Sequence, residues 1–273
     1  MFKKCVLAAV VGSIVLPLAA RAEDAPAAPP ITGNFSMTSN YVFRGISQTM
    51  RNPAVQGGFD YAHASGLYLG TWGSNVSGIQ YGNANLEWDF YGGYAGKINE
   101  DTGYNVGAIH VVYPDGVAST TTKKKWDTTE IYGGVTWKWI NVKASYSVSS
   151  WYGIDKDGFV PSNIDTTTSS ADDATSPDNS KGSLYLEANL TYELPQKVIL
   201  SGHFGHQKIN HFKELDYSDW KLGILKDFSG FVVGLAYTDT NAKKYDLYYL
   251  TDAKGDQVKL GEGAAIISVT KTF

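Results

Sequence analysis

The chain has 273 residues, of which 43% are hydrophobic and 13% aromatic, and it contains 18 Tyr and 29 Gly. This abundance of aromatic residues and glycine favours packed strands over helices, in which glycine is disfavoured. The formal net charge of −4 gives no basic footprint for nucleic-acid binding, and a single Cys excludes an internal disulfide.

The N-terminus has the layout of a secretory signal. Two lysines precede the apolar run 5–20, and small residues follow it, as a signal peptidase requires. The run is short for a membrane-spanning helix. We therefore predict a signal peptide over 1–22, whose removal takes Cys5 with it and leaves 20 basic and 27 acidic residues. The Ala- and Pro-rich residues 23–32 are predicted to form a flexible leader.

Strand-like alternation begins at residue 34. The segment 34–44 has apolar residues on one parity, ending with Tyr41 and Phe43, and mostly polar residues on the other. This is the pattern of a strand with one apolar face. After a break, alternation resumes over 56–61 and, beyond a tight turn, over 67–75. The sequence therefore predicts a series of hairpins.

Three runs in this region carry a resemblance to a known family. They are SNYVFRGISQ at 39–48, PAVQGGFDY at 53–61 and GLYLGTWGSN at 66–75. These runs resemble the signature of the TorF family of outer-membrane porins, also called the Gcw_chp group, and the chain length and C-terminal strand are also similar. The resemblance implies a proteobacterial outer-membrane β-barrel. It brings no catalytic motif.

Further alternating segments follow along the chain. The clearest is 85–95, with Trp88 on one parity and Glu87 and Asp89 on the other. The remaining predicted strands are 104–113, 128–138, 142–151, 183–193, 198–207, 217–226, 231–239 and 263–273. The longest break, 153–182, is rich in Ser, Thr and Asp, and it is predicted to be a mobile external loop and a candidate gate.

The breaks alternate between short and long. This asymmetry is typical of bacterial outer-membrane barrels, which have short periplasmic turns and long extracellular loops. Strands can cross hydrocarbon only as a closed sheet, because each unpaired backbone group there is costly. We predict an all-β transmembrane antiparallel β-barrel of about twelve strands over 33–273. The rival prediction is a secreted β-sandwich with its apolar residues in a core.

If the apolar parity faces lipid, the other parity lines the interior. The residues predicted to line the pore are Arg44, Asp60, Glu87, Asp89, Glu130, Lys138, Lys143, Glu187, His203 and Lys221. One hypothesis is that these charges pair and hold the barrel together. The other is that excess carboxylate around Asp60, Glu87 and Asp89 makes the pore weakly cation-preferring. About twelve strands lie between about eight, which side chains fill, and about sixteen, which leave a channel, so a narrow or plugged pore is expected.

Aromatic residues assigned to the lipid-facing parity are predicted to form an interfacial girdle. They are Tyr41, Phe43, Trp72, Trp88, Trp137, Trp220 and Phe273. The terminal Phe273 also resembles the signal that the outer-membrane assembly machinery reads. Arg44 is predicted either to contact a lipopolysaccharide phosphate or a solute anion, or to pair with an acid such as Asp60.

Signals for catalysis and metal binding are weak. His203 and His206 are three residues apart, so they face opposite sides of a strand, and no Cys accompanies them. Some barrels of this size are phospholipases with a Ser and a His on the outer wall. Ser201 and His203 share a parity, but it is the parity assigned to the lumen, and no orienting partner is evident. We therefore expect no enzyme activity, no cofactor and no metal.

These patterns predict a channel for passive diffusion of small hydrophilic solutes, located in the bacterial outer membrane. Its expected partners are outer-membrane lipid and lipopolysaccharide, the assembly machinery and the solutes themselves. The alternative is a non-conducting structural or adhesive barrel whose external loops bind a partner. Nucleic acid is not an expected partner.

Overall fold

The computed structural model describes residues 30–156, 158, 179–242 and 248–273. The predicted signal peptide over 1–22 lies outside the described residues. So do most of the predicted leader and most of the predicted loop 153–182.

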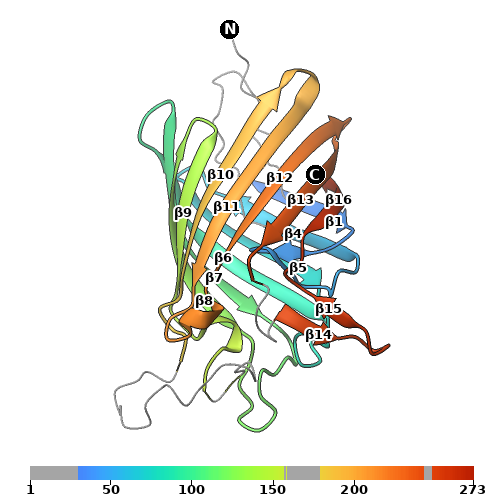
Figure 1. Cartoon of the computed structure of the whole chain (residues 1–273). Coiled ribbons are helices and arrows are strands. Elements are labelled where there is room, and N and C mark those ends of the chain that lie inside the picture. The colour runs from blue at the N-terminus through green and yellow to red at the C-terminus, as the bar shows by residue number, and fades with distance from the viewer. Residues whose placement is uncertain (1–29, 157, 159–178, 243–247) are drawn as a thin grey trace.

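Twelve antiparallel strands close into a single barrel (Figure 1). They are β1 (Ile31–Thr38), β4 (Ala54–Ala62), β5 (Leu67–Asn75), β6 (Leu86–Lys97), β7 (Thr102–Val112), β8 (Thr128–Trp137), β9 (Ile140–Ser147), β10 (Leu184–Leu194), β11 (Val198–Lys208), β12 (Tyr217–Phe228), β13 (Phe231–Thr240) and β16 (Ala264–Thr272). Each strand pairs with its neighbours along the chain, and β1 closes the ring by pairing with both β4 and β16. The predicted barrel is confirmed, and its sheet has no free edge.

The connections differ in length at the two ends of the barrel. Short turns join β4 to β5, β6 to β7, β8 to β9, β10 to β11 and β12 to β13, at the top of Figure 1, and the long connections lie at the bottom. We call these ends the turn end and the loop end. In the turn between β12 and β13, Ser229 and Gly230 adopt left-handed backbone conformations, with φ of 56° and 87°. Two successive left-handed residues make the hairpin turn that matches strand twist.

The loop end carries small elements of its own. The hairpin of β2 (Val42–Phe43) and β3 (Ile46–Ser47) lies between β1 and β4, and that of β14 (Tyr249–Thr251) and β15 (Gln257–Lys259) between β13 and β16. Single 3₁₀ turns occur at the loop end at Trp151–Gly153 and Lys213–Leu215, and another, Pro195–Lys197, forms the short turn between β10 and β11 at the turn end. Among the described residues, no helix is long and apolar enough to cross a membrane.

The predicted first strand over 34–44 is wrong at its C-terminal end. β1 ends at Thr38, whose hydroxyl donates to the Asn40 carbonyl at 3.0 Å, and the Ser47 hydroxyl donates to the Asn40 side chain at 2.7 Å. These bonds hold a turn that takes the chain out of the barrel wall. The alternation of 34–44 therefore spans two elements, and the parity of β1 does not carry over to Tyr41 and Phe43.

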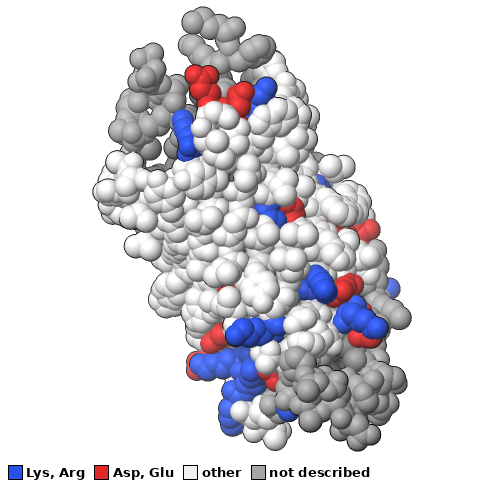
Figure 2. Space-filling view, turned by 90° about the vertical axis from the view of Figure 1, so that its left-hand side faces the viewer, with Lys and Arg blue, Asp and Glu red and all other residues white. Residues whose placement is uncertain are grey.

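The apolar parity of the strands faces outward. Phe35, Leu86, Leu186 and Val269 are 40–49% exposed, instead of meeting in a dry centre as a β-sandwich requires. Most charged side chains on the face shown in Figure 2 lie toward the two ends, and the band between them carries few. An apolar outer wall on a sheet without edges is the arrangement that hydrocarbon demands. The structure is therefore a closed β-barrel with the outer surface of a transmembrane barrel.

The inner wall pairs tyrosine rings with glycines on adjacent strands. A Cβ added to Gly70, Gly93 or Gly205 would overlap Tyr91, Tyr68 or Tyr185, respectively. The rings therefore lie flat against neighbouring backbone, where only glycine leaves room for them.

Buried apolar residues gather at the loop end in two clusters. The loop core consists of Ile46, Met50, Trp151, Ile154, Ile209, Leu215, Tyr217, Ala242, Tyr248 and Leu260. The mouth core consists of Tyr41, Ala54, Val76, Tyr81, Ala84, Val111, Tyr113 and Trp126. The long connections therefore pack against one another and against the end of the barrel.

Candidate functional site in the charged interior

Most of the charged residues predicted to line the pore lie on inward-facing positions of the strands. Asp60 is on β4, Glu87 and Asp89 on β6, Glu130 on β8, Lys143 on β9, Glu187 on β10, His203 on β11 and Lys221 on β12. Glu87, Asp89, Glu130 and Glu187 are no more than 5% exposed although they belong to the wall of the barrel. They form a charged interior surrounded by the apolar outer wall.

Lys138 does not belong to this interior, so its prediction as a pore-lining residue is wrong. It lies in the short turn between β8 and β9 with φ of 52°, its side chain is 46% exposed, and its Nζ lies 3.7 Å from Asp101. The predicted strand 128–138 extends one residue beyond β8, which ends at Trp137. That single residue moves Lys138 from the wall to the turn end.

The hairpin of β2 and β3 turns into the barrel and places Arg44 at its tip. Arg44 and Gly45 have φ of 45° and 78°, which suits a two-residue hairpin turn. A Cβ at Gly45 would lie 2.6 Å from the Cβ of Asp219 on β12, so glycine also permits the tip to approach the opposite wall. We call this element the inner hairpin.

Arg44 joins the inner hairpin to three strands of the wall. Its Nη2 lies 2.6 Å from Glu130 Oε2, and its Nη1 donates to Glu130 Oε1 at 2.9 Å and to Gln207 at 3.0 Å. The guanidinium also lies 4.2 Å from the centre of the Tyr185 ring. Burial alone would lower the pKa of Arg44, but the charge and hydrogen bonds of Glu130 outweigh it and raise that pKa. Arg44 is therefore a fixed cation.

Of the two predictions for Arg44, pairing with an acid is the one that the structure shows, and the acid is Glu130 instead of the suggested Asp60. We expected Arg44 either to contact an external phosphate or solute anion, or to pair with an acid such as Asp60. It pairs with Glu130, because the inner hairpin folds back into the barrel instead of continuing β1 outward. Its side chain is only 7% exposed, which removes it from contact with lipopolysaccharide.

Tyr41 and Phe43 were predicted to face lipid, and both lie inside. The Tyr41 hydroxyl donates to Glu87 Oε1 at 2.5 Å, and the Tyr113 hydroxyl donates to Glu87 Oε2. Burial, together with the charge of Glu87, raises the pKa of Tyr41 well above its ordinary value, so Tyr41 stays a protonated donor. Phe43 packs against Tyr152, with ring centres 5.9 Å apart.

Trp72 was also predicted to face lipid, and it faces inward. It shares the parity of the buried Tyr68 on β5, stands opposite Asp89 in the register of β5 and β6, and contacts the Tyr41 ring at 5.5 Å between centres. The outward residues of this strand are Leu67 and Leu69. The two leucines lie on the odd-numbered positions of the strand and Trp72 on the even-numbered ones. The sequence therefore indicated that Trp72 faces inward if the leucines face lipid.

The other girdle residues lie on the outer surface. Trp88, Trp137, Trp220 and Phe273 are 45%, 50%, 38% and 65% exposed, respectively.

The wall formed by β9 to β12 carries a connected set of charges. Lys143 Nζ lies 2.8 Å from Glu187, and His203 Nε2 lies 3.0 Å from Asp219. The Tyr185 hydroxyl donates to Asp219 at 2.9 Å. Glu187 and Asp219 therefore each have a polar or cationic partner. Asp219 and Tyr185 were missed, although Asp219 shares the inward parity of Lys221, which could have identified it.

The histidine and serine considered for catalysis do not form a nucleophile and base. His203 Nδ1 lies 2.7 Å from the Asn189 side chain, and Nε2 faces Asp219 and Tyr185, so both ring nitrogens are engaged away from Ser201. Within the described ranges, no group of three or more His, Cys, Asp or Glu is arranged to hold a metal ion.

The wall formed by β4 to β6 is acidic, and its inward acids make no ion pair among the described residues. Asp60 accepts a hydrogen bond from the Tyr91 hydroxyl at 2.6 Å, and Glu87 accepts from two tyrosines. Asp89 Oδ1 is buried without a hydrogen-bond partner among the described residues. The named interior acids are Asp60, Glu87, Asp89, Glu130, Glu187 and Asp219, against the bases Arg44, Lys143 and Lys221. The interior has an excess of carboxylate, and that excess lies on one wall.

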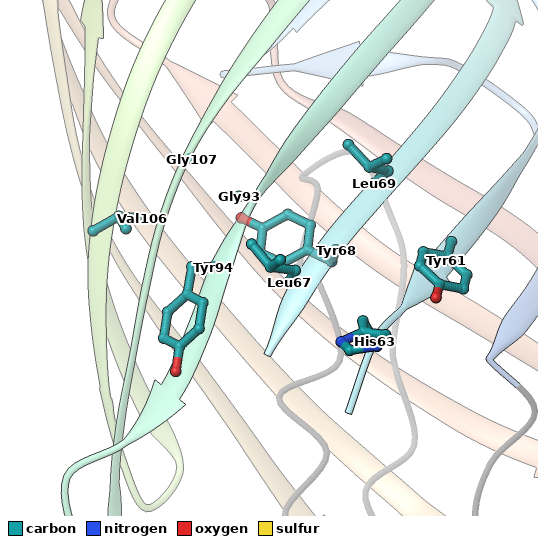
Figure 3. Close-up of a pocket in the computed structure, with 9 residues that line it drawn as sticks. All are labelled: Tyr61, His63, Leu67, Tyr68, Leu69, Gly93, Tyr94, Val106 and Gly107. Atoms are coloured by element: carbon teal, nitrogen blue, oxygen red, sulfur yellow. The ribbon is translucent and has the colours of Figure 1, made fainter. Parts of the chain in front are cut away.

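A separate groove lies on the outer wall near the turn end. Residues of β4 to β7, together with His63, line a volume of about 620 Å³, and Figure 3 shows Tyr61, Leu69 and Tyr94 around it. Leu69 is 65% exposed on the lipid-facing parity, so this apolar groove belongs to the outside of the barrel. It is not part of the charged interior.

Comparisons with known proteins give one family match and several distant structural likenesses. Residues 22–273 match the family described as "Bacterial protein of unknown function (Gcw_chp)". Among solved structures, the KdgM porin is 8% identical with a TM-score of 0.49, and the NanC porin 10% identical with a TM-score of 0.48; each match covers 89% of this chain and 98% of the other. OprD of Pseudomonas aeruginosa is 13% identical with a TM-score of 0.36, and the match covers 89% of this chain and 66% of OprD. At these identities and TM-scores the likenesses carry no conclusion about the function of this chain. No curated protein matches the chain.

Proposed function

This chain belongs to the Gcw_chp family of bacterial proteins, and from that premise we propose that it is a porin-like channel for passive diffusion of small hydrophilic solutes. The resemblance of its N-terminal runs to the TorF porins supports the same proposal. The observation that carries it is the charged inner surface within an apolar outer wall. Charged groups of both signs suit a wetted passage, because burying them without water or partners is costly.

The inner hairpin sets the expected width of the passage. Its tip contacts β8, β11 and β12 through Glu130, Gln207 and the close approach of Gly45 to Asp219. Solutes would therefore pass a constriction at the level of Arg44, and a barrel of this size favours a narrow pore. We expect single channels of small conductance.

A weak preference for cations follows from the excess of carboxylate. The acids Asp60, Glu87 and Asp89 make no ion pair among the described residues, whereas the acids of β9 to β12 face Lys143, His203 and Lys221. Acidic groups along a passage raise the local concentration of cations. Solute size and charge would therefore be selected at two places, the Arg44 constriction and the acidic wall.

The test is conductance in a planar bilayer under a salt gradient. Purified protein should give discrete channels with a cation-preferring reversal potential, and Glu87→Gln with Asp89→Asn should reduce or reverse that preference. The matched control is Asp252→Asn with Asp256→Asn, which removes two carboxylates from the exposed turn between β14 and β15. An unchanged reversal potential in the first double variant would contradict the assigned acidic wall.

The loop core favours a second candidate function. Buried side chains from four connections hold the loop end together, which would suit a non-conducting structural or adhesive barrel. Its external loops would then bind lipopolysaccharide or another partner. Well-inserted protein that never conducts, but that retains lipopolysaccharide through purification, would favour this candidate over the channel.

A further inference from the structure

Asp89 occupies an unusual position in the acidic wall. Its side chain is 5% exposed, and Oδ1 is buried without a hydrogen-bond partner among the described residues. A buried carboxylate oxygen normally has a partner, because losing water without replacement is costly. The position therefore calls for a positively charged or hydrogen-bonding group that the described residues do not supply.

The neighbouring acids cannot share their partners with Asp89. Glu87, two residues away on the same face of β6, has both oxygens occupied by the hydroxyls of Tyr41 and Tyr113. Both oxygens of Glu130 are occupied by Arg44. The three carboxylates thus face a single guanidinium, which is already committed to Glu130.

An aromatic residue is the cross-strand neighbour of Asp89. Trp72 stands directly opposite Asp89 across β5 and β6, on the same inward face, and the Tyr41 ring meets Trp72 edge-on at 5.5 Å. The face of an indole or phenol ring attracts a cation that has lost part of its water. A carboxylate beside such rings is a combination that suits a cation better than a neutral solute.

We propose that Asp89 and Trp72 form a binding site for one small monovalent cation, such as potassium, sodium or ammonium. The described residues offer no group of three or more His, Cys, Asp or Glu arranged to hold a metal ion, and one carboxylate beside an aromatic ring suits a single positive charge better than a divalent ion, which takes several charged oxygen ligands. The proposal deepens the channel function and rests on it, because the cation would reach Asp89 through the interior.

The direct test uses thallium(I), a heavy monovalent cation of similar size to potassium. Crystals of the wild-type protein soaked in a thallium salt should show an anomalous peak at Asp89, and crystals of Asp89→Asn should not. The matched control is Asp60→Asn, on the same wall, because Asp60 already has the Tyr91 hydroxyl as partner. That variant should keep the peak.

Two results would overturn the proposal. One is wild-type crystals without an anomalous peak at Asp89. The other is an infrared band of a protonated carboxyl that disappears in Asp89→Asn, since a proton would then neutralise the site. Neither measurement depends on conduction. Thallium bound at Asp89 in a protein that does not conduct would support the cation site and refute the channel. Conduction without thallium at Asp89 would support the channel and refute the cation site.

Discussion

At the scale of single residues, the Arg44–Glu130 pair joins the inner hairpin to the wall. Both side chains are nearly fully buried, at 7% and 4% exposed. Such a pair contributes little net stability when intact, because both charges lose water, but removing one partner leaves a buried charge uncompensated. The pair therefore makes the position of the inner hairpin specific.

We predict that Arg44→Ala lowers the free energy of unfolding by about 3–5 kcal/mol, because Glu130 is left buried and unpaired. Urea unfolding in detergent or lipid, followed by tryptophan fluorescence, measures this loss. The same variant should raise single-channel conductance, since it releases the tip of the inner hairpin.

The matched control for Arg44 is Arg51→Ala. Arg51 is 33% exposed and its guanidinium contacts backbone carbonyls and Glu262 at the loop end, so a loss below about 1 kcal/mol is expected. The double variant Arg44→Met with Glu130→Gln should recover most of the stability, because no unpaired charge remains. Equal losses in Arg44→Ala and Arg51→Ala would refute this account of the pair.

Alternation could predict residue positions only within a continuous strand. A period of two separates the exposed Trp88 from the buried Glu87 and Asp89, because all three lie inside β6. The same rule failed for Tyr41, because a turn after Thr38 resets the parity. The Arg44–Glu130 contact joins residues 86 positions apart, and no local pattern encodes such a pairing.

At the scale of elements, the tyrosine and glycine pairs fix how neighbouring strands pack on their inner faces. Tyr185 on β10 lies over Gly205 on β11, and the same tyrosine donates to Asp219 and stacks on Arg44. The glycine therefore supports the constriction indirectly, through the position of one ring.

We predict that Gly205→Ala destabilises the barrel by about 1–3 kcal/mol, because the added methyl overlaps the Tyr185 hydroxyl. The matched control is Gly202→Ala on the same strand, where the nearest atom would lie 3.7 Å from the new Cβ. Both substitutions restrict the unfolded chain equally, so their difference in urea midpoint isolates the overlap. A Gly202 variant as unstable as the Gly205 variant would contradict the prediction.

The wall strands could be predicted from sequence because each carries its own apolar parity. The two small hairpins at the loop end could not. β2 and β3 have two residues each, and β14 and β15 have three. In segments this short, an alternation of apolar and polar residues cannot be distinguished from a random sequence. Their placement depends on tertiary contacts such as the hydrogen bond from Ser47 to the Leu260 carbonyl.

At the scale of the whole molecule, closure depends on the pairing of the first and last wall strands. β1 and β16 are paired from Asn34 with Thr272 to Thr38 with Ser268. Their register was not readable from the sequence, because pairing between the ends of a chain leaves no local pattern. The number of strands and the alternation of short and long connections could be predicted, because each strand has its own period-two pattern and each connection its own polar break.

We predict that Met37→Cys with Val269→Cys forms a disulfide across the seam in the folded protein. The two residues are paired in the register, both face outward, and paired Cα atoms lie within disulfide reach. Altered migration on a non-reducing gel measures the bond. The control, Met37→Cys with Ile267→Cys, shifts the partner by two residues and should cross-link poorly; equal cross-linking would indicate a different register.

The loop core has a consequence for how this surface can change over generations. Antibodies and bacteriophages reach an outer-membrane protein from outside, and bacteria escape them by varying the segments on display. Here Ile46, Ile154, Ile209 and Leu260 come from four separate connections and are buried together. A change in one connection would be transmitted to the other three, so escape variants should concentrate at solvated positions and spare these four residues.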